Sequence, residues 1–287
     1  MSQRRVLIIG AGGQLGTAFA ELLPDARRVT RERLDLAEAS PADLGRLLHE
    51  SGASVVINCA AYTNVDQAEL EEALATQVNG WAVGRLAAVA AELDIRLITY
   101  STDYVFDGQG QRPYLESDMT DPVNAYGRSK LVGEREALVT DASILVIRTS
   151  WVLSATHRNF VTAILSRARQ GQPLKVVADQ RGCPTIAADL AVATLAGLEA
   201  EATGLLHLTN RGETTWFDLA RTAIEAADLD SSLVSPCPTE DYPTPARRPA
   251  YSVLGSEVAP KLGLEPLPHW TSSIESVVSG SMRLIGG

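Results

Sequence analysis

Residues 6–16, which read VLIIGAGGQLG, decide the fold. An apolar strand ends at Gly10, further glycines follow at Gly13 and Gly16 with the spacing G-x-x-G-x-x-G, and the helical segment TAFAELL comes next. Glycine permits a positive φ and lets the backbone approach a ligand, while the free N–H groups at a helix N-terminus attract an anion. The stretch therefore predicts a strand–turn–helix unit that binds the pyrophosphate of a dinucleotide.

The rest of the first half repeats the alternation of strand and helix. Apolar runs predict further strands within residues 27–30, 53–61, 95–103 and 143–150, with helical patterns between them. Their nearly continuous apolar character is typical of parallel strands buried on both faces. We therefore predict an α/β fold with a doubly wound, Rossmann-like parallel sheet, formed by a dinucleotide-binding domain of residues 1–150.

The regular alternation of strand and helix patterns ends after residue 150, where short strands and helices lead into a proline-rich stretch. Residues 151–287 are expected to form a second, smaller α/β domain that holds the substrate. Part of residues 178–203 is also assigned to the dinucleotide-binding domain, so that the two domains are interleaved.

Composition excludes several classes of function. The formal net charge of −10 leaves no basic patch for a nucleic-acid backbone, and no run approaches the roughly 18 apolar residues of a membrane span. We expect no nucleic-acid or membrane partner and no export signal. Three cysteines show neither a disulfide framework nor a zinc pattern, and are expected to be reduced thiols of a cytoplasmic protein: Cys59, Cys183 and Cys237.

The residues after the second strand bear on the choice of dinucleotide. An acidic residue there would hold the ribose hydroxyls of NAD, whereas this sequence has Arg31 and Arg33, which suit a 2′-phosphate. NADP(H) is therefore predicted, with NAD(H) open as the alternative, because both arginines could also be solvated surface charges. Asp35 and Leu36 follow where the adenine edge could be contacted.

A tyrosine and a lysine stand four residues apart in DPVNAYGRSKLVGE, residues 121–134. On a helix Tyr126 and Lys130 share one face, and an ammonium near a phenol is expected to lower the phenol pKa from about 10 toward neutrality. Pro122 and Asn124 are expected to set the start of this helix. The alternative is an exposed helix pair without function. Because Thr102 ends a buried strand on the ligand side of the sheet, the sequence predicts carbonyl reduction with tyrosine as the proton donor.

Seven motifs together resemble the extended short-chain dehydrogenase/reductases, and within that family the reductases of nucleotide-linked 4-keto-6-deoxy sugars. The resemblance covers nearly the whole chain and is carried by GAGGQLG, INCAAYTNVDQAE, STDYVFDG, NAYGRSKLVGE, RTSWV, DQRGCPT and YPTPARRPAYSVL.

The resemblance implies a role for each matching residue. Three residues match the catalytic triad: Thr102, Tyr126 and Lys130. Cofactor binding is implied for Gly10, Gly13, Gln14, Leu15, Gly16, Arg31, Asp35, Leu36, Ala60, Ala61, Tyr62, Thr63, Tyr126 and Lys130. Substrate binding is implied for Val65, Thr102, Tyr104, Tyr126, Trp151, Asn159, Arg247 and Arg248. Structural alternatives stay open for three of these, with Trp151 as a core anchor between the domains and Arg247 and Arg248 as surface charges.

The implied reaction is NADPH-dependent reduction of the C4 ketone of a dTDP-6-deoxy-L-hexulose by a monomer or homodimer. Two alternatives stay open, a related NDP-4-keto-6-deoxy sugar as substrate, or a non-catalytic NADP-binding subunit like the regulatory β subunit of methionine adenosyltransferase. A 4,6-dehydratase would need a glutamate where Tyr104 follows Asp103. Some relatives carry magnesium between glutamates at a dimer contact, but Ala18 stands where a carboxylate would be needed. The histidines His157, His207 and His269 show no metal spacing, so no metal is expected.

Overall fold

Six parallel strands form the central sheet of the computed structural model, which describes residues 4–140 and 143–286. Their order is β10-β5-β4-β3-β1-β2. The strands are β1 (Val6–Ile9), β2 (Arg27–Val29), β3 (Val55–Asn58), β4 (Arg96–Thr102), β5 (Leu145–Thr149) and β10 (Gly204–His207). The chain order reverses at β1, which pairs with both β2 and β3, so the ligand crevice is expected outside the carboxyl ends of these strands.

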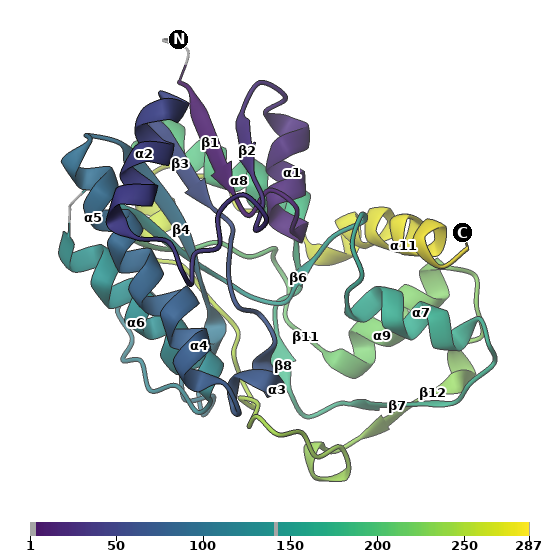
Figure 1. The fold of residues 1–287 in the computed structure, drawn as a ribbon. Coiled ribbons are helices and arrows are strands. Elements are labelled where there is room, and N and C mark those ends of the chain that lie inside the picture. Colours follow the sequence, from purple (N-terminus) through teal and green to yellow (C-terminus); the bar gives the residue numbers. More distant parts are fainter. Residues whose placement is uncertain (1–3, 141–142, 287) are drawn as a thin grey trace.

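Helices cover both faces of this sheet (Figure 1). The helices α2 (Pro41–Ser51), α5 (Ala82–Glu92) and α6 (Ala125–Thr140) share a core with Leu7 and Ile9. On the opposite face, α1 (Gln14–Leu22) and α8 (Ala187–Glu199) share a core with Ile8. Successive residues of β1 thus face opposite layers, which is why its sequence is apolar throughout. The predicted α/β fold with a doubly wound parallel sheet is confirmed.

Local signals set the helix ends. Helix α2 begins with a capping box, in which the Ser40 side chain accepts from the Asp43 N–H group and the Asp43 carboxylate accepts from the Ser40 N–H group. Pro41 occupies the first turn, and Gly52 ends the helix in the left-handed conformation with a φ of 58°.

A second core lies beside the sheet and forms the lobe at the right of Figure 1. It contains α7 (Phe160–Ala168), α9 (Trp216–Ala226) and α11 (Trp270–Gly286), with the parallel pair β7 (Leu174–Val177) and β12 (Val234–Cys237). Two further pairs join short strands, β6 (Val152–Leu153) with β9 (Thr185–Ile186) and β8 (Arg181–Gly182) with β11 (Thr214–Thr215).

The remaining elements are short. They are α3 (Val65–Ala68), α4 (Glu72–Thr76), α10 (Val258–Lys261), the π-helix η1 (Gln77–Trp81) and the 3₁₀ helices η2 (Asp103–Val105), η3 (Ser231–Leu233) and η4 (Thr239–Asp241). Within residues 4–140 and 143–286, no helix has the length and apolar character to cross a membrane.

The chain crosses between the two lobes more than once. Helix α8 lies within the residues assigned in part to the first domain and packs with α1, and β10 just after it adds the edge strand of the main sheet. We propose that residues 187–207 belong with the dinucleotide-binding domain and that the second lobe is built from the chain on either side of them.

Candidate active site

The glycine-rich loop connects β1 to α1 and passes close to the end of β3. Gly10 has a φ of +76°, and a Cβ atom there would lie 2.5 Å from the Ala60 nitrogen. A Cβ atom at Gly16 would lie 2.2 Å from the Gly10 carbonyl oxygen. Gly13 caps α1, and a Cβ atom there would have its nearest neighbour, the Gly10 carbonyl oxygen, 3.5 Å away. Two glycines therefore permit close packing, while the N-terminus of α1 at Gln14 stays open to an anion.

The residues after β2 differ in how strongly the rest of the protein holds their side chains. The Arg31 side chain is 78% exposed and pairs with Asp35 at 3.1 Å, a surface pair that contributes at most about 1 kcal/mol. The other Asp35 oxygen accepts from the Ala37 N–H group at 3.0 Å. Leu36 is buried in the sheet core, because its side chain packs under α2 and α5. Arg31 can therefore turn toward a phosphate, whereas the expected adenine contact of Leu36 is not available to its side chain.

The segment after β3, residues 60–63, is held by a buried asparagine that sequence reasoning missed. Asn79, 1% exposed, accepts from the Tyr62 N–H group at 2.8 Å and donates to the Tyr62 carbonyl and to Ser129 on α6. The Tyr62 hydroxyl donates to Glu71 at 2.7 Å, while Thr63 is exposed. Asn79 lies in the π-helix η1, an irregularity that often occurs at functional sites and that no sequence pattern announced.

Thr102 ends β4 and joins three groups of the site. Its hydroxyl donates to Asp103 at 3.0 Å and accepts from the Tyr104 N–H group at 3.2 Å. It also lies close enough to the hydroxyl of Tyr126 on α6 to lower the pKa of that phenol against the effect of burial. The sheet and the helix therefore bring together two of the three residues of the predicted triad, although they are far apart in the sequence. Lys130 lies one helical turn further along the same face of α6.

Two residues that flank Tyr126 fix the start of α6. The Asn124 side chain accepts from the Gly127 N–H group at 2.8 Å and donates to the Arg247 carbonyl at 2.9 Å. Gly127 lies against η2, where a Cβ atom would come within 2.1 Å of the Tyr104 carbonyl oxygen. The prediction that Asn124 helps set the helix start is confirmed, and the same side chain ties α6 to the loop that carries Arg247.

Burial dominates the electrostatics of the triad. It lowers the pKa of Lys130 to about 8, and Glu134 opposes this shift. The pKa of Tyr126 is raised, chiefly by burial and then by Asp103, while the Thr102 hydrogen bond acts in the other direction. The expectation that Lys130 draws the phenol pKa toward neutrality is therefore wrong for this arrangement, because the Lys130 ammonium donates to the Tyr100 carbonyl instead. Tyr126 stays a neutral proton donor at physiological pH.

Asp103 is a further buried acid that sequence reasoning did not place in the site. Only 2% of it is exposed, and burial raises its pKa to about 7, against the lowering effect of the nearby Ser252 hydroxyl and of the Thr102 hydrogen bond. Its position directly after Thr102 was the available signal.

The expected substrate residues divide into a group near the triad and a group further away. The Tyr104 ring meets Tyr126 edge-on, with 6.1 Å between the centroids. Arg248 is paired at 2.9 Å with Asp66, the neighbour of Val65 on α3, and lies close enough to Tyr104 to act on its pKa. Arg247 is exposed, so the two arginines have different surroundings.

Trp151 belongs to the second lobe. Its ring stacks on Trp216, with 3.5 Å between centroids and 8° between planes, and its φ is +46°. A Cβ atom at Gly182 would come within 2.5 Å of the ring. Within residues 4–140 and 143–286 its buried Nε1 has no hydrogen-bond partner. One face of the indole is therefore covered by protein, which supports the core-anchor alternative.

The Asn159 side chain makes hydrogen bonds within the protein. Its oxygen caps α7 by accepting from Val161 and Thr162, and its nitrogen donates to Ser154, His157 and Gln14. Gln14 in turn donates to the Val152 carbonyl, so these contacts tie the first turn of α1, Gln14 and Leu15, to the second lobe. Its predicted role in substrate binding remains a prediction.

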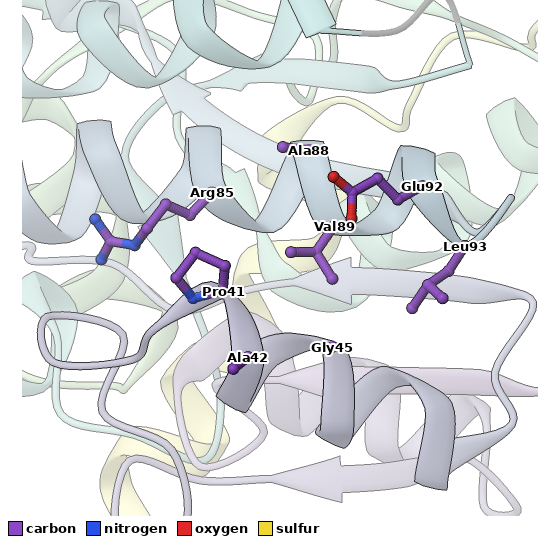
Figure 2. Close-up of a pocket in the computed structure, with 8 residues that line it drawn as sticks. All are labelled: Pro41, Ala42, Gly45, Arg85, Ala88, Val89, Glu92 and Leu93. Atoms are coloured by element: carbon purple, nitrogen blue, oxygen red, sulfur yellow. The ribbon is translucent and has the colours of Figure 1, made fainter.

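Neither a metal site nor the hollow between α2 and α5 coincides with these residues. In the described part of the chain, no group of three or more His, Cys, Asp or Glu residues could hold a metal ion. A hollow of about 430 Å³ lies between α2 and α5 (Figure 2), where Gly45 faces Val89 and the charged residues are Arg85 and Glu92. None of its lining residues is a candidate site residue.

Comparison with known proteins places the chain among sugar-nucleotide reductases. The model of the family described as the RmlD substrate binding domain matches residues 4–282. A dTDP-4-dehydrorhamnose reductase of Burkholderia thailandensis is 41% identical, over 94% of this chain and 96% of the relative. A dTDP-4-keto-6-deoxy-D-glucose reductase of Streptomyces niveus is 37% identical, over 94% and 95%.

A solved structure agrees. The dTDP-4-dehydrorhamnose reductase of Bacillus anthracis in complex with NADP superposes with a TM-score of 0.91 at 32% identity, over 96% of this chain and 98% of that one.

Proposed function

This chain belongs to the family of the RmlD substrate binding domain, and we propose from this that it is an NADPH-dependent oxidoreductase of dTDP-rhamnose synthesis. It reduces the C4 ketone of dTDP-4-dehydro-6-deoxy-L-mannose and releases dTDP-L-rhamnose. The observation that carries this proposal is the meeting of Thr102 at the end of β4 with Tyr126 on α6, one turn from Lys130.

The cofactor is NADP(H), which the Bacillus anthracis relative binds. The residues fit this group because the N-terminus of α1 is open at Gly13 and Arg31 is weakly held. We assign the pyrophosphate to Gly10, Gly13, Gln14, Leu15 and Gly16, the 2′-phosphate to Arg31, and the remaining contacts to Asp35, Leu36, Ala60, Ala61, Tyr62 and Thr63. Leu36 would contribute through its backbone.

The chain's own residues handle the proton. When bound, NADPH supplies the hydride that C4 receives. Tyr126 donates its phenolic proton to the oxygen on C4, and its raised pKa ensures that the proton is present. We assign Thr102 a hydrogen bond to the same oxygen, since its hydroxyl is near enough to Tyr126 to act on the pKa of the phenol. We assign the Lys130 ammonium, one helical turn from Tyr126, to the nicotinamide ribose.

The nucleotide sugar is assigned to residues around this centre. We assign Val65, Tyr104 and Arg248 to the part of the substrate next to the triad, because Arg248 pairs with Asp66 and acts on the pKa of Tyr104. Trp151, which is partly exposed, would contact the base, and the Arg247–Arg248 pair would hold the diphosphate. Asn159 would act by holding Gln14 and α7 in place.

NADPH consumption tests the function directly. The purified chain, with no partner protein, is given the dTDP-4-keto sugar made in situ by the preceding dehydratase and epimerase, and the product is identified. Formation of dTDP-L-rhamnose with matching NADPH oxidation is expected. Cofactor binding without turnover would instead support the regulatory-subunit alternative.

A related sugar is the second candidate, because the Streptomyces niveus relative is named for a D-glucose-derived substrate. Leaving out the epimerase presents that sugar instead. A higher kcat/KM without the epimerase than with it would move the assignment to this substrate. The proposal calls for no nucleic acid or membrane, and for a monomer or homodimer.

A further inference from the structure

A buried ion pair lies behind the triad. Both oxygens of Glu134 on α6 accept from Arg148 on β5, with the Nε atom at 2.8 Å and Nη2 at 2.7 Å. The two side chains are 3% and 4% exposed. A buried bidentate pair of this kind is costly to desolvate and often contributes little to stability, so its position calls for an explanation.

Helix geometry places this pair next to the catalytic lysine. Tyr126, Lys130 and Glu134 are spaced four apart, so they lie along one face of α6. Lys130 donates to the Tyr100 carbonyl, and within the described residues it makes no hydrogen bond or ion pair with Glu134. Because Arg148 occupies both carboxylate oxygens, Glu134 acts on the ammonium through its field and leaves the hydrogen bond from the ammonium to Tyr100 in place.

The histidine that contacts Arg148 is held in one protonation state. His207 on β10 has Nδ1 at 2.7 Å from the Gly255 carbonyl, which can only accept, so Nδ1 carries the proton. Nε2 is then the acceptor for Arg148, at 3.3 Å. Burial lowers the pKa of His207, which keeps the ring neutral, and the Arg148 guanidinium lies 5.0 Å from the centre of the Phe106 ring. His207 therefore presents an acceptor to Arg148 and adds no second positive charge beside the pair.

The other titratable groups around Lys130 do not supply this negative charge. Asp103 acts on Tyr126, and the Cys59 thiol stays neutral because burial raises its pKa. Tyr100 presents its carbonyl, and burial raises the pKa of its hydroxyl. Glu116 and Asp118 act on His207, beyond the pair: Glu116 accepts from the His207 N–H group and from Ser256.

Resting on the proposed function, we propose that Glu134 is a positioning residue for the reduction, whose carboxylate, held by Arg148, keeps the buried Lys130 ammonium charged one helical turn from Tyr126. Without it, burial would favour neutral Lys130, and the site would lose the cation that is assigned to the nicotinamide ribose.

The chain allows a direct test because it contains only three lysines, Lys130, Lys175 and Lys261. In the full-length protein labelled with ¹³C at lysine Cε, NMR follows the titration of each, and Lys130→Arg assigns the signal of interest. Lys175 and Lys261 are exposed and serve as internal controls. The variants are Glu134→Gln, Arg148→Met and the double variant, which removes both charges and keeps a foldable core if the single variants do not fold.

The proposal predicts opposite effects from the two partners. Glu134→Gln and the double variant should lower the pH at which Lys130 titrates by about one unit or more. Arg148→Met should raise it, because Glu134 then has only Lys130 as its partner. The alkaline limb of kcat should move by the same amounts. An unchanged Lys130 titration in the folded double variant, or a fall in Arg148→Met equal to that in Glu134→Gln, would overturn the proposal.

The NMR arm needs no substrate. If the wild-type chain fails to reduce the dTDP-4-keto sugar while the variants show these changes in the Lys130 titration, the proposed function is contradicted and the electrostatic role of Glu134 stands. If the wild-type chain reduces the sugar while the variants leave the Lys130 titration unchanged, the proposed function stands and the role of Glu134 is contradicted.

Discussion

Gly127 on α6 lies against the backbone carbonyl oxygen of Tyr104, so closely that a Cβ atom at residue 127 would be 2.1 Å from it. This contact sets how near Tyr126 comes to Thr102. Gly127→Ala should push α6 away from η2, lower kcat by about tenfold or more, and destabilise the fold by about 1–3 kcal/mol. Turnover and thermal unfolding measure both effects.

Gly45→Ala is the matched control for this change. Gly45 also lies within a helix, but the nearest atom to a Cβ there is 3.9 Å away. The variant should keep wild-type turnover, and its free energy of unfolding should rise by up to about 1 kcal/mol. Equal effects at the two glycines would show that the close approach of α6 and η2 is not what matters.

Tyr126→Phe keeps the ring and removes the proton. We expect kcat to fall by on the order of 10²–10⁴ while NADPH affinity is nearly unchanged, because the lost group acts as a general acid in the transition state. Tyr100→Phe removes a hydroxyl that bonds only Thr194 among the described residues, and should leave turnover nearly intact. Wild-type turnover in Tyr126→Phe would remove the mechanism.

The pH dependence should report Lys130. Burial lowers its pKa to about 8, so the ammonium is present below that pH and is lost as the pH rises through it. Tyr126 keeps its proton over this range, since its pKa is raised. The kcat measured with both substrates saturating should therefore fall on the alkaline side near pH 8. A profile that stays flat well above this pH would contradict a role for charged Lys130.

Arg31→Ala should raise the KM for NADPH and change that for NADH little, because the guanidinium is assigned to the 2′-phosphate. The weak pair with Asp35 means that little stability is lost. Arg46→Ala, which changes an exposed arginine of α2 that has no assigned ligand, is the control and should affect neither cofactor. An equal loss with NADPH and NADH in Arg31→Ala would withdraw the assignment.

Arg248→Ala should weaken dTDP binding by about tenfold or more in calorimetry while NADPH binds normally, since this guanidinium lies next to Tyr104 and Asp66. Arg247→Ala should have a smaller effect, because this side chain is exposed. The opposite order of the two effects would assign the diphosphate to Arg247.

Local patterns carried the predictions that succeeded. The apolar runs and the glycine spacing of residues 6–16 predicted the doubly wound sheet, because strand period, turn conformation and helix start depend on neighbours in the chain. The four-residue spacing of Tyr126 and Lys130, and the cap at Asn124, are local to one helix and were also predictable.

Only the tertiary structure decided how these groups are tuned and which residues support them. The raised pKa of Tyr126, the Trp151–Trp216 stack and the Glu134–Arg148 pair each depend on segments that are separate in the sequence. Burial is a property of the packed molecule, so the sequence, which showed a lysine near a tyrosine, could not show that both would be desolvated. The sequence by itself determined the architecture and the chemistry available to the site, and packing determined the charge state in which that chemistry operates.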